Sequence, residues 1–286
     1  MSKSIVIGVD VGGTFTDTLA LDEATGAVRV EKVPSTKGDQ SNGFLSGILA
    51  ATDHDLSSVS TIIHGTTVAT NALLERKGAK AGIITTEGFR DVLEMRRRDR
   101  PSTWGLWGQF TPVIERKCRL EVPERTLANG TVVKDVDEAS IKAVAQDLIA
   151  QGCESVCLFF INGYANTDNE TKAARILRQV WPNDYVSVAT EILPEIREFE
   201  RCSTASLNAY LQPVVANYLA RLETRIAEDD AGSEILIVQS NGGIMSVDTA
   251  KALPVRTALS GPAAGVVAAR QIAKAAGFEN VITCDM

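Results

Sequence analysis

An apolar segment near the start of the chain ends in an acid and a pair of glycines. Residues 5–9 are apolar, Asp10 follows them, and Gly12 and Gly13 precede a second run in which threonine and apolar residues alternate (IGVDVGGTFTDTLALD, 7–22). Glycine lacks a Cβ and tolerates positive φ, so this pattern predicts a tight strand–turn–strand hairpin. The chain is therefore predicted to open with two antiparallel strands.

The same corner has the composition of a phosphate site. The backbone N–H groups of Gly12, Gly13 and Thr14 would form an anion-binding concavity, and Thr14 and Thr16 would add hydroxyl donors. Asp10 would repel phosphate directly, but Mg²⁺ is commonly held by one or two carboxylates together with phosphate oxygens. We therefore predict a Mg²⁺–phosphate site in which Asp10 is the metal ligand and a catalytic residue; the alternative is a plain hairpin with a surface aspartate. The corner has neither the Gly-Lys-Ser/Thr ending of a Walker loop nor a GxGxxG opening a helix.

Short apolar runs alternate with amphipathic segments along the rest of the chain. Strands are expected at 5–9, 18–21, 28–33, 62–64, 81–85, 156–161, 186–189, 235–238 and 281–284. Helices are expected at 68–77, 140–150 and 203–228, the last with a kink at Pro213. Strands that alternate with helices predict the α/β class with a largely parallel sheet, to which the opening hairpin adds antiparallel strands.

Composition excludes several classes of function. The 286 residues include 29 basic and 36 acidic side chains, so the net charge of −7 argues against nucleic-acid binding. No apolar run approaches the ~20 residues of a membrane span. The five cysteines form no CxxC pair and there are only two histidines, which argues against a zinc site and favours reduced, buried thiols. A cytoplasmic protein of about two domains is expected.

A second group of polar residues follows the strand expected at 62–64. His64 could contact a substrate carbonyl or a transferring phosphoryl group, and Thr66 and Thr67 could donate hydroxyl hydrogen bonds there, because open α/β sheets bind ligands at the carboxyl ends of their strands. The alternative is that His64 ends a strand with a hydrogen bond and the threonines cap the next helix. Further along, Ser260 is expected to be the N-cap of a helix with Pro262 in its first turn.

Longer motifs resemble one protein family. The segments IGVDVGGTFTD, IIHGTTVATNALLERKGAKAGIITTEGFRDVLEMRR, LPEIREFERCSTASLNAYLQP, VQSNGGIMS and LSGPAAGVVAA occur in this order. They resemble hydantoinase A, the ATP-binding subunit type of ATP-dependent hydantoinases, of oxoprolinases and of the β subunits of acetone and acetophenone carboxylases. The opening corner is also similar to the first phosphate loop of the actin, sugar-kinase and Hsp70 ATPases. The resemblance implies an actin-like (ribonuclease H-like) ATPase fold with a mixed sheet, and ATP and Mg²⁺ as cofactors.

The resemblance also implies a domain organisation. Residues 6–11 (VIGVDV) are similar to residues 281–286 (VITCDM), and actin-like ATPases consist of two related domains that each open with such a strand. We expect an amino-terminal actin-like domain at 1–190, with a loop-rich insertion at 96–135, and the beginning of a second hydantoinase A domain at 191–286. On this interpretation the second domain is truncated before its phosphate loop. Residues 1–286 alone are then expected to bind ATP weakly or not at all, to hydrolyse nothing and to self-associate.

The function implied by the resemblance is ATP-dependent hydrolysis of a cyclic amide. Phosphoryl transfer to the ring carbonyl oxygen of a hydantoin, oxoproline or related lactam would prepare the ring for opening by water. The expected partner is a hydantoinase B-type subunit or domain in a hetero-oligomer. Two alternatives stay open: the β subunit of an ATP-dependent ketone carboxylase, and a non-enzymatic actin-like module that switches conformation with nucleotide.

Overall fold

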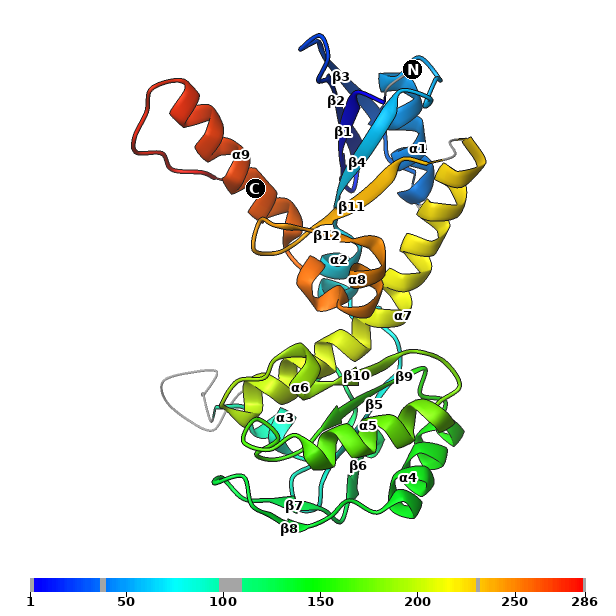
Figure 1. Ribbon diagram of the computed structural model, residues 1–286, viewed down its shortest axis with the longest axis vertical. Coiled ribbons are helices and arrows are strands. Elements are labelled where there is room, and N and C mark those ends of the chain that lie inside the picture. Colours follow the sequence, from blue (N-terminus) through cyan, green and yellow to red (C-terminus); the bar gives the residue numbers. More distant parts are fainter. Residues whose placement is uncertain (1–2, 37–39, 98–109, 230–231, 285–286) are drawn as a thin grey trace. The chain divides into compact units, whose positions relative to one another are not determined.

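The computed structural model describes residues 3–36, 40–97, 110–229 and 232–284, which form two compact units (Figure 1). Unit 1 comprises Met1–Glu75 and Val214–Met286, and unit 2 comprises Arg76–Pro213. Each unit is therefore an α/β body of its own, and unit 1 is assembled from two separate parts of the chain. The two domains expected from the sequence, 1–190 and 191–286, follow each other along the chain, and this division stays a prediction. Within the described ranges, no helix combines the length and apolarity needed to cross a membrane.

Unit 1 is built on a six-stranded mixed sheet in the order β12-β11-β4-β1-β2-β3. Its strands are β1 (Ile5–Val11), β2 (Phe15–Asp22), β3 (Val28–Pro34), β4 (Val59–Thr66), β11 (Glu234–Val238) and β12 (Ile244–Ser246). β1, β2 and β3 pair antiparallel, as the opening hairpin predicts, whereas β4 pairs parallel with both β1 and β11. The expected α/β class with a mixed sheet is confirmed.

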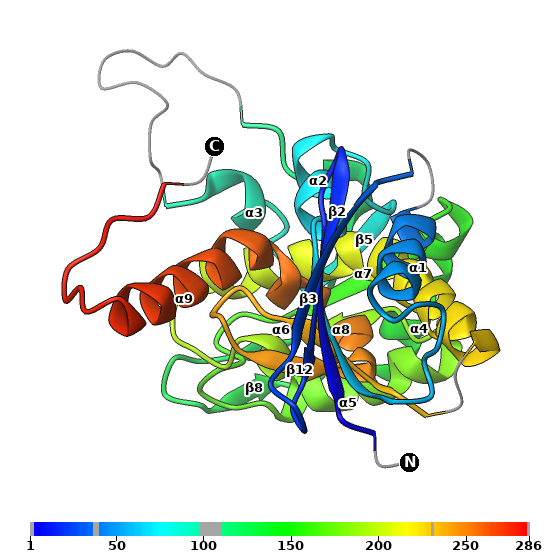
Figure 2. The same ribbon diagram turned by 90° about the horizontal axis from the view of Figure 1, so that it is seen from above.

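Helices cover the two faces of this sheet differently. α1 (Gln40–Ala51) packs against β1, β2 and β3, and α9 (Ser260–Ala275) contacts β4 and β11. Figure 2 shows α1 and α9 on opposite sides of the strands. Since successive strand residues point to opposite faces, the buried Ile7, Val9 and Val11 face α1, whereas the residues between them face the side of α9. Three shorter elements complete unit 1: α2 (Val68–Leu74), α8 (Val247–Ala252) and the 3₁₀ helix η2 (Pro254–Thr257).

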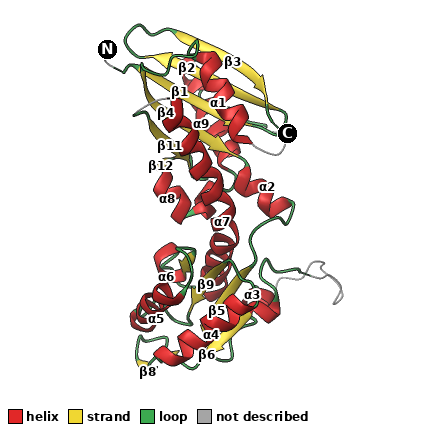
Figure 3. Ribbon diagram, turned by 90° about the vertical axis from the view of Figure 1, so that its right-hand side faces the viewer, coloured by secondary structure: helices red, strands yellow, loops and turns green. Residues whose placement is uncertain are grey.

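Unit 2 contains a four-stranded parallel sheet in the order β10-β9-β5-β6. Its strands are β5 (Ala81–Thr86), β6 (Arg119–Val122), β9 (Ser155–Phe159) and β10 (Val186–Val188), beside a small hairpin of β7 (Arg125–Thr126) and β8 (Val132–Lys134). α4 (Glu138–Ala150) and α5 (Asp168–Val180) contact each other and this sheet (Figure 3). The shorter helices of unit 2 are α3 (Val92–Met95), η1 (Arg116–Cys118) and α6 (Ala189–Ile192). The segment 96–135, expected to be a loop-rich insertion, supplies β6 to the sheet, while residues 98–109 lie outside the described part.

Most expected elements occur where the sequence places them. α4 begins after Asp137, whose carboxylate accepts a hydrogen bond from the backbone N–H of Ser140 at 2.9 Å, and it ends at the predicted residue. α2 is shorter than expected, because Arg76 adopts the left-handed region (φ 55°), which a continuing helix does not allow. Each expected strand except 281–284 overlaps an observed strand.

The strand expected at 281–284 does not form. These residues are exposed, Ile282 to 95%, and belong to no sheet of the described chain. A strand needs a neighbour that pairs its N–H and C=O groups, and apolar character alone does not supply one. Asp285, expected to correspond to Asp10 in a second domain, lies outside the described residues.

A single long helix, α7 (Glu198–Asp229), contains Pro213 and belongs to both units. Proline has no N–H, so the carbonyl of Ala209 loses its helical donor. The hydroxyl of Ser155 at the start of β9 donates to that carbonyl at 2.6 Å. The next carbonyl, of Tyr210, accepts the N–H of Ala79 at 2.9 Å. Neighbouring segments of unit 2 therefore supply hydrogen-bond donors to these two carbonyls of α7 close to Pro213.

Candidate functional site

The turn between β1 and β2 places two glycines in different environments. The N–H of Gly12 donates to the carbonyl of Phe15 at 3.0 Å, and a Cβ on Gly12 would lie 2.9 Å from that oxygen, closer than real Cβ contacts. A Cβ on Gly13 would meet nothing within 4 Å. Both glycines keep φ outside the left-handed region, so the expected use of positive φ here is wrong. Position 12 therefore needs a glycine because the backbone of Phe15 is too close for a Cβ, whereas Gly13 leaves open space above the turn.

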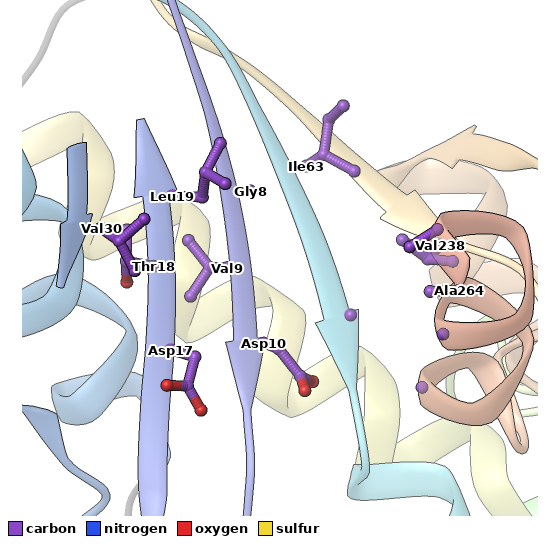
Figure 4. Close-up of a pocket in the computed structure, with 14 residues that line it drawn as sticks. Gly8, Val9, Asp10, Asp17, Thr18, Leu19, Val30, Ile63, Val238 and Ala264 are labelled. Carbon is purple, nitrogen blue, oxygen red and sulfur yellow. The ribbon is translucent and has the colours of Figure 1, made fainter. Parts of the chain in front are cut away.

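Two carboxylates lie side by side below this turn. The antiparallel register pairs Asp10 on β1 with Asp17 on β2, so both side chains point to the same face of the sheet (Figure 4). Like charges directly opposite each other are destabilising. Lys32 on β3 partly offsets the repulsion, because its ammonium donates to both oxygens of Asp17 at 2.9 and 3.1 Å.

The sequence reading missed Asp17 as a site residue. The signal was present, because a hairpin whose turn is centred on Gly13 and Thr14 pairs positions 10 and 17. Both acids occur in the motif that predicts the hairpin. We add Asp17 to the candidate site.

Asp10 and Asp17 line a pocket of about 560 Å³ between the sheet and α9 (Figure 4). The rest of its wall is formed by small and apolar residues: Gly8, Val9, Thr18, Leu19, Val30, Ile63, Gly65 and Val238 from the sheet, and Gly261, Ala264, Gly265 and Ala268 from α9. The parallel register places Gly65 beside Asp10, and a Cβ on Gly65 would lie 3.5 Å from Asp10 Oδ1. The pocket is thus acidic at the end of β1 and apolar along its length.

Thr14 and Thr16 lie on different sides of the hairpin. Thr14 is exposed at the turn, beside Gly13, as the phosphate-site prediction requires. Thr16 is fully buried on the face of α1, and its hydroxyl lies 3.0 Å from the hydroxyl of Ser35. Strand alternation points the Thr16 hydroxyl to the face opposite the carboxylates, and its part in phosphate binding stays a prediction.

Thr66 and Thr67 close the connection between β4 and α2. The hydroxyl of Thr66 accepts the N–H of Val68 at 3.2 Å, and the hydroxyl of Thr67 donates to the carbonyl of Val11 at 3.3 Å. Thr67 occupies the N-cap position of α2, but its side chain makes no capping bond there. Both residues lie at the carboxyl end of β4, as expected, and Thr67 holds the end of β1.

His64 is a core residue in this structure. Its side chain is 0% exposed, with Nε2 at 2.9 Å from the hydroxyl of Tyr218 on α7 and Nδ1 at 3.3 Å from the carbonyl of Val9. The ring of Phe44 on α1 packs edge-on at 4.8 Å between centroids. Burial lowers the pKa of His64 from 6.5 to about 4, against a smaller opposing effect of the hydrogen bond to Val9, so the imidazole is neutral at pH 7.

The structure does not bring His64 to the pocket. Alternation along β4 points Ile63 and Gly65 toward the pocket and His64 toward α1 and α7. Its burial conflicts with the expectation that His64 contacts a substrate carbonyl or phosphoryl group. The alternative, a hydrogen-bonded residue near the strand end, agrees with these contacts.

The start of α9 differs from the expected cap. Leu259 takes the N-cap position in the left-handed region (φ 62°), and Ser260 is the first helical residue. The hydroxyl of Ser260 donates to the carbonyl of Thr66 at 3.2 Å, and the N–H of Leu259 donates to Thr70 Oγ1 at 2.9 Å. These contacts attach the start of α9 to the carboxyl end of β4, so the expected N-cap role of Ser260 is wrong.

The carboxylates at the turn suit a cation that brings other ligands with it. Over the described ranges, no group of three or more His, Cys, Asp and Glu side chains could hold a metal ion. Mg²⁺ is usually bound through one or two carboxylates together with substrate phosphates and waters. Asp10, with Asp17 beside it, fits that kind of site and does not form an all-protein cage.

Comparisons with known proteins agree with the recognised motifs. Residues 6–181 match the model of the hydantoinase/oxoprolinase N-terminal region, and residues 201–286 match that of hydantoinase/oxoprolinase. The caprolactamase subunit alpha of Pseudomonas jessenii is 32% identical over 290 residues, which cover 98% of this chain and 42% of the relative. The acetophenone carboxylase gamma subunit of Aromatoleum aromaticum is 30% identical over 305 residues, 98% of this chain and 41% of the relative. That subunit is named gamma, whereas the resemblance led us to expect a β subunit.

A solved structure confirms the fold. The crystal structure of the ATP-dependent caprolactamase from Pseudomonas jessenii superposes with a TM-score of 0.85 at 32% identity, over 98% of this chain and 42% of that chain. The described α/β units with their mixed sheet are consistent with the expected actin-like ATPase fold. The chain spans about two-fifths of the length of the relatives it matches. It belongs to the hydantoinase/oxoprolinase family.

Proposed function

We propose that this chain forms the ATP-binding amino-terminal part of an enzyme that hydrolyses a cyclic amide. The observation that carries the proposal is the β1–β2 turn, where Gly13 leaves open space above two paired carboxylates, Asp10 and Asp17. The similarity to an ATP-dependent caprolactamase supports a lactam as the substrate class. ATP would phosphorylate the ring carbonyl oxygen, one water would add to the ring carbon and expel the ring nitrogen to leave an acyl phosphate, and a second water at the same carbon would release phosphate.

Residues in and beside the turn have different roles in this proposal. The backbone N–H groups of Gly13 and Thr14 and the hydroxyl of Thr14 would donate to phosphate oxygens. Asp10 would hold Mg²⁺, with Asp17 beside it, and Mg²⁺ would neutralise charge on the transferring phosphoryl group. Thr67 would keep the end of β1 in place through its bond to Val11.

In this proposal the protein works as part of a hetero-oligomer in the cytoplasm. Both relatives described above are named as subunits, which supports a complex with a second, hydantoinase B-type subunit or domain. A second candidate function is ATP-dependent ketone carboxylation. It is favoured by the acetophenone carboxylase relative, whose identity of 30% is close to the 32% of the caprolactamase subunit.

Phosphate release by the full-length protein with its partner distinguishes these functions. Caprolactam, 5-oxoproline and hydantoin are each added with Mg-ATP, in parallel with acetone or acetophenone plus bicarbonate. We expect one of the cyclic amides to stimulate phosphate release together with ring opening. Stimulation by a ketone plus bicarbonate would support the second candidate. Nucleotide binding with no stimulated turnover would instead support a non-enzymatic module that switches conformation with nucleotide.

The Asp10→Asn variant tests the site itself. The amide removes the charge that holds the cation, so turnover should fall at least ~100-fold while the fold is retained. Asp22→Asn is a matched control, because Asp22 lies at the far end of the same hairpin, opposite Ile5. Equal turnover in wild type and Asp10→Asn would exclude Asp10 as the metal ligand.

A further inference from the structure

A hydrogen-bonded chain of buried groups runs through unit 1 on the face of the sheet away from the pocket. Tyr218 on α7 is 2% exposed and His64 on β4 is 0% exposed. The Tyr218 hydroxyl lies 2.9 Å from His64 Nε2, and His64 Nδ1 lies 3.3 Å from the carbonyl of Val9 on β1. Three elements that are distant in sequence are therefore joined by two hydrogen bonds.

The chemistry of the partners fixes the direction of both bonds. A backbone carbonyl only accepts, so the proton lies on Nδ1, which donates to Val9. A neutral imidazole carries one N–H, which leaves Nε2 as an acceptor for the hydroxyl of Tyr218. The desolvated site keeps His64 neutral, since burial lowers its pKa to about 4. One tautomer is thus selected, with Tyr218 donating to His64 and His64 donating to Val9.

The chain of bonds ends next to the candidate site. Val9 immediately precedes Asp10, and the parallel register pairs Val9 with His64 and Asp10 with Gly65. On the other side of Asp10, the carbonyl of Val11 accepts the hydroxyl of Thr67 at 3.3 Å. Side chains from β4 and from the residue after it therefore hold the carbonyls on both sides of Asp10.

We propose that His64 and Tyr218 are positioning residues for Asp10. The bonds from Tyr218 through His64 to Val9 fix the end of β1, and so fix the direction in which the Asp10 carboxylate leaves the strand. This assignment replaces the direct substrate contact expected from the sequence. Its consequence for turnover rests on the proposed function, whereas the bonding pattern and its effect on the hairpin do not.

The tautomer is tested by ¹⁵N NMR of histidine-labelled protein at pH 7. The chain has only two histidines, so the His54→Gln variant isolates the imidazole of His64. We expect a protonated Nδ1 and a bare Nε2, with the Nε2 signal shifting in Tyr218→Phe because its donor is lost. A protonated Nε2, or an Nε2 signal that Tyr218→Phe leaves unchanged, would overturn the proposal.

The positioning effect is tested by hydrogen exchange of the hairpin amides at residues 10–15. Tyr218→Phe should increase exchange there several-fold, because one anchor of β1 is removed. Tyr210→Phe is the matched control, since it removes the hydroxyl of another buried tyrosine of α7, in unit 2. Equal hairpin exchange in the two variants would contradict the positioning role.

The catalytic consequence is tested in the full-length complex. His64→Ala should raise the Mg²⁺ concentration needed for half-maximal turnover about tenfold, and His64→Asn should restore part of it because its amide N–H replaces Nδ1. A purely structural residue would lower the folded fraction and leave the Mg²⁺ dependence of the folded molecules unchanged. That outcome would refute positioning. If the wild type shows no turnover, the proposed function fails, and NMR and hydrogen exchange still decide this inference.

Discussion

Adjacent glycines of one motif have different physical reasons to be glycine. Gly12 is held against the carbonyl of Phe15, where a Cβ would approach to 2.9 Å, whereas Gly13 has no neighbour within 4 Å of a Cβ. The fold therefore constrains Gly12 but leaves Gly13 free to serve a ligand. A sequence pattern alone does not separate these two roles.

Alanine substitutions separate the two roles. Gly12→Ala should lower the free energy of unfolding by about 1–3 kcal/mol, because the methyl group overpacks the turn. Gly13→Ala should change it by less than about 0.5 kcal/mol and instead weaken ATP binding by the full-length protein. Urea unfolding and nucleotide titration of both variants measure this. Equal losses of stability would show that the turn needs both glycines for folding.

The buried His64 makes stability depend on pH. Its folded pKa of about 4 lies below its ordinary value of 6.5, so the unfolded state binds the proton more strongly. The part of the unfolding free energy that depends on neutral His64 is therefore fully present above pH 6.5 and is lost as pH falls toward 4. The loss is about 2 kcal/mol between pH 7 and pH 5.

His64→Asn is the control for this pH dependence, since asparagine does not titrate and the carboxylates are the same in both proteins. The loss of unfolding free energy between pH 7 and pH 5 should be about 2 kcal/mol larger in wild type than in the variant. Urea unfolding at the two pH values measures the difference. Parallel losses would show that His64 is charged or solvated in the folded protein.

Local patterns predicted the hairpin because its partners are close in sequence. Asp10, Gly12 and Gly13 were identified from one short motif, and the pairing of Asp10 with Asp17 follows from the same turn. The burial of His64 was not predictable in this way. Its partner Tyr218 lies 154 residues away, and only the packing of α7 against the sheet brings the two together.

At the scale of elements, α1 shows why one helix was missed by the sequence analysis. It contains Gly43 and Gly47, and glycine lowers helix propensity. A Cβ at these positions would lie 2.9 Å from Thr16 Oγ1 and 2.4 Å from Thr18 Oγ1. The glycines let α1 approach β2, so tertiary packing overrides local preference.

In α7, which continues through Pro213, the hydroxyl of Ser155 on β9 donates to the Ala209 carbonyl, which proline leaves without its helical donor. Ser155→Ala should leave the buried Ala209 carbonyl without its donor and lower the free energy of unfolding by about 1–3 kcal/mol. In the Pro213→Ala background, the new N–H at position 213 can donate to the same carbonyl. The loss caused by Ser155→Ala should then be smaller, which a double-mutant cycle by urea unfolding measures. Additive effects would mean that Ser155 does not replace the missing helical bond.

At the scale of the whole molecule, the chain builds unit 1 from two distant segments. It leaves unit 1 after α2 and returns along α7. Contiguous stretches of sequence do not reveal such a division, because it depends on β11 pairing with β4. The motifs identified the family and the fold class. Which segments form each unit could not be predicted from them, because it depends on pairing between strands that are distant in sequence.

The pocket-side face of unit 1 leaves large apolar side chains exposed. Leu19 on β2 is 46% exposed and Val30 on β3 is 66% exposed, and both line the pocket. Contiguous apolar surface promotes association, so residues 1–286 should self-associate with increasing concentration. Sedimentation velocity should show more monomer in a Leu19→Ser/Val30→Ser variant.

The control is Leu127→Ser, which removes an exposed leucine from unit 2 and should leave the association unchanged. A wild-type chain that stays monomeric at high concentration would contradict the prediction. So would an equal response of both variants, since the association would then not depend on this face.

The central claim is that ATP activates a ring carbonyl by phosphorylating its oxygen. The most direct measurement uses the full-length complex and the cyclic amide that stimulates phosphate release, labelled with oxygen-18 at its carbonyl. If the carbonyl oxygen accepts the phosphoryl group and both waters, the one that opens the ring and the one that releases phosphate, attack the former ring carbon, the label leaves with the phosphate. The account predicts inorganic phosphate carrying one oxygen-18 atom for each ring opened. Unlabelled phosphate, with the label retained in the ring-opened acid, would contradict it.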